Sequence, residues 1–400
     1  MNLHTPYPYW LMRHGIINSY ASLEEDVKAD VAIMGMGISG ALVAWQLCQA
    51  GYSVVVVDKR HPGTGSTAAS TALLQYEIDT PLHKLAEMIG EKNAVTSYQR
   101  CLQSISDLDG LCRKLNKEGL FVAKPSLQFA SYKSHVRDLE KEFKMRKKYG
   151  IRVQWLDRND MKEKFGFDRD AGILSKDGAQ ADAYRITHLL LEKCFNKGAR
   201  LYNNTEVSDI RHHRRSVELI TLDKRKIHAK KLVIACGYES QKYISRKVQD
   251  LDSTFAITSE PFSGQHFWHR NALIWETAKP YLYLRTTSDD RILVGGKDLP
   301  FSSPVKRDLA LPSKVKGLER SFSKLFPHIP FKTDFKWAGV FASTKDGLPY
   351  IGSIPERPNT YFALGFGGNG ITFSMIAAQM ITGMIAGKRE STGDIFSFDR

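Results

Sequence analysis

Two glycine-rich segments of the chain have the residue types and spacing that bind phosphate groups. Gly35, Gly37 and Gly40 form one G-x-G-x-x-G pattern, and residues 365–370 contain a second. An apolar run precedes each pattern and a helical pattern follows it, so free N–H groups at a helix start could bind an anion. The first question is therefore whether the protein binds two dinucleotides or one.

A second candidate site lies in residues 275–301, which we predict to be a β-hairpin with a polar turn. The period of two along a strand would put Tyr281, Tyr283 and Arg285 on one face. Two phenols and a guanidinium could hold a substrate carboxylate, with the arginine donating two hydrogen bonds. The alternative is a solvent-facing strand with ordinary surface aromatics. Arg291, after the turn, is interpreted as structural.

The first glycine pattern belongs to a complete nucleotide-binding unit. The chain reads as a strand (31–34), a glycine turn, a helix (about 40–49) and a second strand (54–57). Asp58 ends the second strand, about 20 residues after the last glycine, where a carboxylate would accept hydrogen bonds from ribose hydroxyls. This unit predicts a Rossmann-like dinucleotide site.

The second glycine pattern does not begin another such unit. Only 30 residues follow Gly370. They read as one largely apolar helix and a short tail, without the further strands that a nucleotide-binding domain needs. The sequence therefore predicts one dinucleotide, not two.

A segment of small and hydroxyl-bearing residues, 63–82, follows the first unit. Ser66 and Thr67 are candidate helix caps, and the segment could lie closely along an extended cofactor. The alternative is an ordinary capped helix. The nucleotide-binding unit does not by itself decide between FAD and NAD. If the cofactor is FAD, no covalent attachment is predicted in this segment, because no cysteine or histidine occurs between Pro62 and Pro81.

The composition narrows the class of protein. The chain has 400 residues, 42% of them hydrophobic, which allows a sizeable core in one or two domains. Its five cysteines lack metal-ligand spacing, so we expect a reduced, cytosolic protein without a metal site. No signal peptide is predicted. Glycines interrupt both long uncharged runs, 31–57 and 359–387, so no membrane span is expected.

The formal net charge is +14, with basic clusters at 141–152, 211–215 and 224–231. The simplest interpretation is a set of solvated faces. An anionic substrate, an anionic membrane surface and RNA are the alternatives. Few aromatic residues are interleaved with the clusters and no RNA-binding module is visible. Nucleic acid is therefore not the expected partner, while peripheral membrane binding stays open.

Beyond these motifs, the chain from about residue 30 to 388 resembles the D-amino-acid oxidase/glycine oxidase (DAO) superfamily of FAD-dependent oxidoreductases. Four stretches carry the resemblance in the family's order. They are "VAIMGMGISGALVAWQL" with "VVVVDKR", "GSTAASTALL", "KKLVIACGYES", and "WAGVFASTKDGLPYIG" followed by "YFALGFGGNGITFS". The resemblance implies non-covalently bound FAD, with the last glycines near the flavin ring.

The residues that the glycine turn and the resemblance together assign to FAD lie in all four stretches, with Val207 added for backbone contacts at the adenine end. They are Gly35, Gly37, Ile38, Ser39, Gly40, Asp58, Lys59, Arg60, Gly65, Ser66, Thr67, Ala68, Ser70, Thr71, Val207, Ala235, Cys236, Gly237, Gly367, Gly368, Asn369, Gly370, Ile371 and Thr372.

The resemblance further implies an α/β fold, in which a Rossmann-like FAD-binding domain is joined to a substrate domain of mainly antiparallel β-sheet plus helices. We assign to the FAD-binding domain residues 28–118, 178–250 and 335–390, and to the substrate domain residues 119–177 and 251–334. The N-terminal extension, 1–27, has no counterpart in these motifs. Its prolines and aromatics favour an ordered strap over the surface.

One position departs from the family pattern. Many relatives carry an arginine after the W-A-G of the C-terminal motif, where it grips an amino-acid carboxylate, whereas this chain has Phe341. Either Arg285 replaces that arginine or the substrate is not a free amino acid.

The predicted reaction is hydride transfer from a small amine, amino acid or hydroxy acid to flavin N5, in an oxidase or dehydrogenase. An alcohol would need a protein base, for which His266 and His269 are the candidates, although a histidine in such a position is more often a surface or packed one. Two alternatives are a flavoprotein acting on modified tRNA and a non-catalytic flavin-binding or electron-relay protein. The electron acceptor, whether oxygen, a quinone or a protein, stays open.

Overall fold

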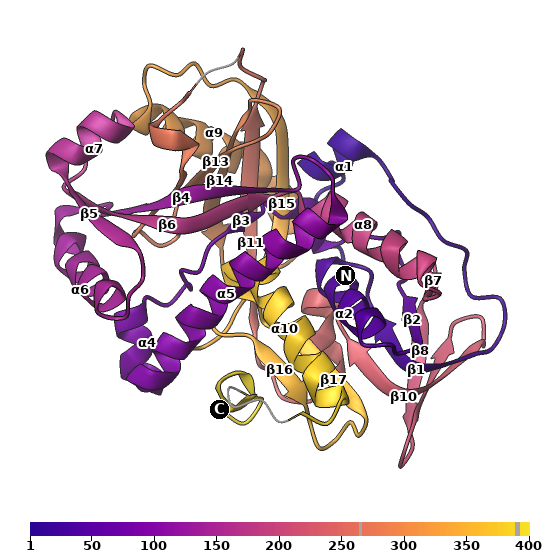
Figure 1. Ribbon diagram of the computed structural model, residues 1–400. Coiled ribbons are helices and arrows are strands. Elements are labelled where there is room, and N and C mark those ends of the chain that lie inside the picture. Colours follow the sequence, from indigo (N-terminus) through magenta and orange to yellow (C-terminus); the bar gives the residue numbers. More distant parts are fainter. Residues whose placement is uncertain (264–265, 389–392) are drawn as a thin grey trace.

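Two β-sheets organise the chain in a computed structural model that describes residues 1–263, 266–388 and 393–400 (Figure 1). The first is a largely parallel sheet with helices against it, and the second is mainly antiparallel. The predicted α/β class, with a Rossmann-like part and a second sheet, is confirmed.

The first sheet has a parallel core in the order β17-β10-β1-β2-β7. Its strands are β1 (Val27–Met34), β2 (Val54–Val57), β7 (Arg200–Tyr202), β10 (Lys226–Ile234) and β17 (Thr360–Leu364). Antiparallel β16 (Tyr350–Ser353), β9 (Val217–Thr221) and β8 (Val207–His212) extend it. Because both faces are covered, alternate residues of β1 enter two different core clusters, Val31 and Ile33 in one and Ala32 and Met34 in the other.

Helices cover the face of the first sheet to which Val31 and Ile33 point. They are α2 (Ile38–Gln49), α5 (Glu91–Leu115), α8 (Ala183–Asn196) and α10 (Gly370–Ile385). Helix α2 packs against both α8 and α10, and α10 also packs against α5 (Figure 1). The starts of α2 and α10 therefore lie near one another although more than 300 residues separate them in sequence.

The second sheet has the order β15-β11-β14-β13-β12-β4-β6-β3, with β5 paired to β6. Its strands are β3 (Leu73–Leu74), β4 (Phe121–Phe129), β5 (Val153–Asp157), β6 (Ala171–Ala181), β11 (Asp250–Ser259), β12 (Leu273–Glu276), β13 (Tyr283–Thr286), β14 (Ile292–Leu299) and β15 (Thr333–Ser343). Among the described strands of this second sheet, only β12 and β4 pair in parallel. The predicted hairpin is β13 and β14, which pair antiparallel.

Helices also flank this sheet. Helix α9 (Pro304–Leu325) packs on β11, β14 and β15, and α6 (Val136–Lys148) and α7 (Arg158–Phe165) pack near β5 and β6. The remaining helical segments are α1 (Tyr9–His14), α3 (Ser66–Ala69), α4 (Leu82–Ile89) and the 3₁₀ turns Lys133–His135, Gly237–Tyr243, His269–Asn271, Gly367–Asn369 and Gly393–Phe396.

Two strands join the second sheet from segments that we assigned to the FAD-binding part. Strand β15 pairs with β11, and β3 pairs with β6. The division into two domains stays a prediction, and these pairings show that the segments around residues 73 and 335–343 connect the two sheets.

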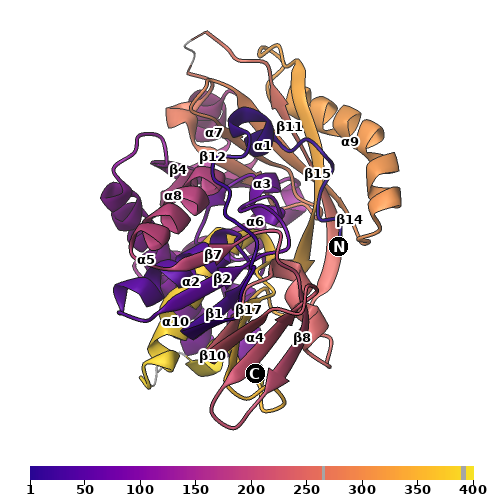
Figure 2. The same cartoon turned by 90° about the vertical axis from the view of Figure 1, so that its right-hand side faces the viewer.

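The N-terminal segment 1–27 adds to this connection. Residues 3–5 pair with β15 through Val340 N–H to Leu3 O and Thr5 N–H to Ala338 O, both 3.0 Å (Figure 2). Helix α1 then buries Tyr9 and Trp10, and the chain continues along α8 and β7 to β1 (Figure 1). The segment is therefore an ordered strap, as its composition favoured.

Trp10 anchors the strap, since its side chain is 2% exposed and its Nε1 donates to Ser70 O at 2.7 Å. We expect Trp10→Ala to lower the free energy of unfolding by about 3–5 kcal/mol, because a large buried ring is removed. The midpoint of urea unfolding measures the loss. Tyr7→Ala is the control, because Tyr7 is 67% exposed. Equal midpoints for the two variants would contradict an anchoring role.

Ion pairs occupy part of each basic cluster. Lys144 pairs with Glu140 at 2.6 Å, Lys230 with Asp30 at 2.8 Å, and Arg211 with Glu218 at 3.5 Å. The Lys144–Glu140 pair is largely exposed, as a solvated face requires, whereas Glu218 is buried. Arg146 of the first cluster is also fully buried and pairs with Glu142 at 2.7 Å, so this cluster is not solvated throughout.

Candidate functional site

Two adjoining cavities lie where the parallel sheet meets the second sheet. We call the first the turn cavity, because it is lined by the glycine turn after β1, by Asp58 and by residues 235–239. We call the second the tyrosine cavity, because Tyr281 and Tyr283 line it together with Asp298. Both are lined by Ser66, Ser70, Tyr238, Gly370 and Ile371. A long ligand could therefore extend from one into the other.

Backbone approach explains the first glycines. Gly35 has φ +115°, and a Cβ there would lie 2.4 Å from Ala235 O. A Cβ on Gly40 would lie only 1.8 Å from Gly35 O, so α2 can approach the turn only with glycine at this position. Gly37 has no such backbone clash, and its nearest neighbour would be Thr67 Oγ1 at 3.2 Å. Gly40 consequently supports the turn from behind and does not line the cavity.

The starts of two helices face the cavities. Ile38 and Ser39, at the start of α2, line the turn cavity, and Gly370 and Ile371, at the start of α10, line both. Neither helix has a side-chain cap. Ser39 and Ser374 join the two helices by a hydroxyl–hydroxyl hydrogen bond of 2.7 Å. Two helix dipoles therefore favour negative charge in this region.

Asp58 lies at the end of β2, as predicted, and lines the turn cavity. Its carboxylate accepts Met36 N–H at 2.7 Å and Arg60 N–H at 2.9 Å. Burial raises its pKa despite these hydrogen bonds. A further donor, such as a ribose hydroxyl, would stabilise the charged form of this buried group.

Lys59 and Arg60 also line the turn cavity, but their charges are already paired. Glu239 accepts from Lys59 Nζ at 3.0 Å and from Arg60 at 2.6 Å. Burial opposes ionisation of Glu239, yet the cations around it outweigh burial and hold its pKa at about 2. This arrangement joins the end of β2 to the turn after β10.

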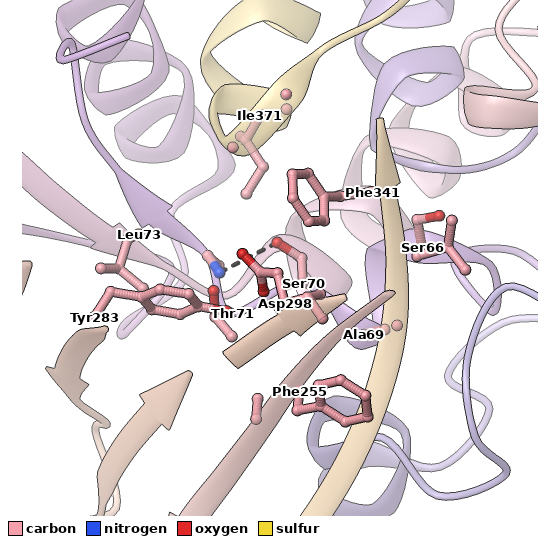
Figure 3. Close-up of a pocket in the computed structure, with 18 of the residues that line it drawn as sticks. Ser66, Ala69, Ser70, Thr71, Leu73, Phe255, Tyr283, Asp298, Phe341 and Ile371 are labelled. Carbon is pink, nitrogen blue, oxygen red and sulfur yellow. Dashed lines mark hydrogen bonds between the residues drawn. The ribbon is translucent and has the colours of Figure 1, made fainter. Parts of the chain in front are cut away.

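The small-residue segment lies along both cavities. Thr67 Oγ1 accepts Ile38 N–H at 3.0 Å, and Ser70 Oγ accepts Ala72 N–H at 3.1 Å (Figure 3). Ser66 Oγ is buried at the junction of the cavities and has no hydrogen-bond partner. A buried orphan hydroxyl is expected where a ligand supplies the missing partner.

These observations fit FAD. The glycine cradle and helix starts suit a pyrophosphate, Asp58 suits a ribose, and the tyrosine cavity lies next to them, where the flavin ring would extend. Ser66 would then meet the cofactor near the junction of the cavities.

The tyrosine cavity combines phenols, one carboxylate and apolar walls. Figure 3 shows Phe341 and Ile371 on one side of the view and Tyr283 and Asp298 on the other. Burial, with help from Asp79, raises the pKa of Tyr281 far above its usual range, and burial and Asp298 raise the pKa of Tyr283 to about 12. Both phenols therefore keep their protons at neutral pH and can donate hydrogen bonds.

The expectation for Arg285 needs correction. Arg285 reaches the backbone of Thr71, a residue of the cavity wall, but its own guanidinium does not line the cavity. Its Nη1 donates to the carbonyls of Thr71, Ala72 and Ala181 at 2.8–3.1 Å, and its Nε donates to Thr286 O at 3.0 Å. Carbonyls from three separate segments thus occupy the donors that a substrate carboxylate would need.

Several predicted residues lie behind the cavity walls. Ala68 and Gly40 are buried and line neither cavity. Val207, the first residue of β8, also lines neither cavity and packs against the core cluster that contains Val217 and Leu219 of β9. Asn369 Nδ2 donates to Gln75 O and Glu77 O at 2.8 and 2.9 Å, and Thr372 Oγ1 reaches Gln75 O at 3.4 Å. These last two residues hold the segment 75–77 against the start of α10.

The two histidines proposed as bases do not line either cavity. His266 is exposed, and His269 packs edge-on against Phe165 with ring centroids 5.8 Å apart. The remaining predicted residues do line a cavity, Phe341 and Thr71 the tyrosine cavity among them.

Two carboxylates of this region were missed in the sequence. Asp298 lines the tyrosine cavity, and Asp79 accepts Gly368 N–H at 2.9 Å and Tyr281 O–H at 3.2 Å. A signal for Asp298 exists: Gly295 and Gly296 inside a predicted strand indicate a bulge that re-aims the next side chains. Asp79 lies in a loop, and no feature of the neighbouring sequence predicts where that loop lies in the fold.

A family model described as DAO, FAD dependent oxidoreductase, matches residues 30–384. Glycine oxidase from Geobacillus kaustophilus is 26% identical over 93% of this chain and 96% of its own. Gamma-glutamylputrescine oxidoreductase from Escherichia coli is 25% identical over 93% and 88%. The solved structure of L-alpha-glycerophosphate oxidase from Mycoplasma pneumoniae, with FAD bound, has a TM-score of 0.75 at 16% identity, covering 90% of this chain and 95% of that one.

Clusters of potential metal ligands and membrane-spanning helices were both sought in the sequence analysis, and the part of the chain that the structure describes contains neither. It contains no group of three or more histidine, cysteine or acidic side chains placed to hold a metal ion. Across the same residues, none of the helices combines the length and the apolar character needed to cross a bilayer.

Proposed function

Because the chain belongs to the DAO family of FAD dependent oxidoreductases and its cofactor is FAD, we propose that it oxidises a small amine at the carbon next to nitrogen. The observation that carries this proposal is the tyrosine cavity, which adjoins the turn cavity and offers two phenols and one carboxylate to a substrate. Among the described lining residues there is no lysine, arginine or histidine to bind a substrate carboxylate.

The chemistry divides between cofactor and protein. When bound, FAD supplies the hydride acceptor. On the substrate, the C–H bond breaks with its electron pair, the nitrogen lone pair forms a C=N bond, and water later hydrolyses the imine. The protein orients the amine through Tyr281, Tyr283 and Asp298, and Phe341 and Ile371 exclude water from the apolar side.

The starts of the helices contribute electrostatically. The N-terminal end of α10 opens on both cavities, so its dipole and free N–H groups favour negative charge there. This supports a site built to accept a hydride, which brings negative charge with it.

The relatives support the same reaction type with different donors. One is named for glycine and another for gamma-glutamylputrescine. An α-amino acid or α-hydroxy acid would bring a carboxylate close to Asp298, whereas an amine without a carboxylate would not. We therefore place carboxylate-free amines ahead of amino acids and hydroxy acids.

The test is the visible absorption spectrum of the purified holoenzyme, recorded without oxygen before and after adding amines, amino acids and hydroxy acids. We expect bleaching of the flavin absorption by at least one carboxylate-free amine. A flavin that is fully reducible by dithionite but bleached by no compound of the panel would contradict catalysis of this type. Bleaching by α-amino acids alone would contradict the preference for carboxylate-free amines.

A further inference from the structure

Asp298 occupies an irregular position in strand β14. Between the pairs Ser253–Leu299 and Phe255–Gly296 the register shifts, so Lys297 and Asp298 oppose the single residue Thr254. Lys297 has φ +61°, which is rare for a residue other than glycine, asparagine or aspartate. The bulge aims the Asp298 side chain into the tyrosine cavity (Figure 3).

The same stretch makes room for the phenols. A Cβ on Gly295 would lie 2.2 Å from the Tyr283 ring, and a Cβ on Gly296 would lie 2.3 Å from Tyr281 O. The two glycines therefore leave space for the tyrosines, and the bulge that follows turns Asp298 toward the same cavity.

The carboxylate of Asp298 is only partly satisfied, since Thr254 is its hydrogen-bond partner and one of its oxygens has none. Its Oδ1 is buried and makes no hydrogen bond. Burial raises its pKa to about 6; Thr254 opposes the rise, while Asp252 and Asp79 add to it. A buried carboxylate with an unsatisfied oxygen and without a paired cation in its cavity is unfavourable by itself, so we take it to indicate that a ligand supplies the counter-charge.

The surrounding charges support a cationic ligand. Phe341, Ile371 and the two protonated phenols face the same space, and none of them carries a positive charge. The charge of Lys314 of α9 acts on Asp298, but Lys314 does not line the cavity and places its Nζ over the Phe255 ring at 5.7 Å.

We propose that the substrate is a carboxylate-free amine whose cationic nitrogen is bound by Asp298, with Tyr281 and Tyr283 beside it. This specificity rests on the proposed amine oxidation and names its substrate class. The nitrogen next to the reacting carbon must be neutral when the hydride leaves. The cation held by Asp298 is therefore a second nitrogen of the substrate, which makes diamines and their mono-substituted derivatives the expected class.

The test uses two probes of one shape and opposite charge. tert-Butylammonium and pivalate both lack hydrogen on the carbon that bears the charged group, so neither can be oxidised there. Each is titrated into oxidised holoenzyme at pH 7.5, and the shift of the flavin absorption gives the dissociation constant. We expect tert-butylammonium to bind at least about tenfold more tightly than pivalate, since hydrogen bonds to charged groups are the stronger ones.

Replacing Asp298 with asparagine isolates the carboxylate. Asp298→Asn should weaken tert-butylammonium binding about 10- to 100-fold. The matched control is Asp290→Asn, which makes the same change in the exposed turn of the same hairpin, where asparagine accepts the positive φ of 56°. The melting temperature separates binding from folding, because replacing a buried carboxylate that has no paired cation with a neutral amide should leave the melting temperature equal or higher.

The pH dependence supplies a second measurement. In the wild type, tert-butylammonium binding should weaken as pH falls through about 6, because Asp298 then takes up a proton. The charged or titratable groups facing Asp298 are Tyr281 and Tyr283 of the β13 side, Asp252 of β11, Asp79 and Lys314. Asp298→Asn should abolish this dependence.

The results of the probe titrations can be judged separately from those of the flavin-bleaching experiment. Equal binding of the two probes by the wild type, or unchanged tert-butylammonium binding in Asp298→Asn, would overturn the assignment even if an amine bleaches the flavin. Failure of every amine to bleach the flavin would remove the proposed oxidation while leaving the probe titrations to be judged by themselves.

Discussion

Replacing Gly40 with alanine is expected to yield a protein that no longer retains FAD. The added Cβ would lie 1.8 Å from the carbonyl oxygen of Gly35, which is backbone and cannot rotate away. Helix α2 would have to move from β1, and its first N–H groups would leave the place where they face the turn cavity. Overpacking of this kind costs about 1–3 kcal/mol or more, so FAD affinity should fall by at least about tenfold to a hundredfold.

The measurement is the ratio of flavin to protein absorbance after purification, followed by titration of the apoprotein with FAD. Gly110→Ala is the control, because Gly110 lies within α5, has no positive φ, and has no neighbour within 4 Å of the place where an alanine Cβ would lie. That substitution should be neutral or stabilising by up to about 1 kcal/mol, since alanine is the better helix former. Wild-type FAD affinity in Gly40→Ala would show that close packing at this turn is unnecessary.

The parts of the fold that the sequence predicted are those set by local patterns. The run of valines at 54–57 with glycines before it and Asp58 after it can form only a buried strand next to a tight turn, and the structure has β2 there. The same holds for the helix after Gly370, whose apolar residues on all sides require full burial. Such signals act over fewer than about 20 residues and do not depend on distant partners.

The parts that were missed depend on long-range pairing. Strand β15 spans the predicted boundary at 335, and it pairs with β11, some 80 residues earlier in the chain. The position of the strap residues 3–5 beside β15 likewise has no local signal. Asp298 was missed because candidate site residues were taken only from the first strand of the predicted hairpin, although Gly295 and Gly296 marked a bulge in the return strand.

Arg285 shows the same limit in a single side chain. Alternation placed it correctly relative to Tyr283, but the sequence could not show which groups would meet its guanidinium. In the structure those groups are the carbonyls of Thr71, Ala72, Ala181 and Thr286, and the Trp10 ring lies 5.6 Å from the guanidinium carbon. One side chain thus joins the small-residue segment, β6, β13 and the strap.

We therefore expect Arg285→Met to destabilise the protein and not to change its substrate preference. Methionine preserves most of the length of the side chain but removes the guanidinium donors. Ala72 O keeps the N–H of Ala181 at 3.1 Å, and each buried carbonyl left without a donor costs about 1–3 kcal/mol. The free energy of unfolding should fall by at least about 3 kcal/mol, and FAD should be released at lower urea concentration because Thr71 lines the tyrosine cavity. Urea unfolding followed by tryptophan and flavin fluorescence measures both changes.

Arg13→Met is the matched control, since Arg13 forms a partly exposed pair with Asp289 at 2.8 Å. Its loss should cost no more than about 1 kcal/mol. The substrate-binding interpretation of Arg285 predicts the opposite pattern, in which Arg285→Met unfolds at the wild-type urea concentration and binds pivalate more weakly. The guanidinium donates to four backbone carbonyls and not to a ligand. We therefore expect the folded fraction of Arg285→Met to bind tert-butylammonium and pivalate with wild-type affinities.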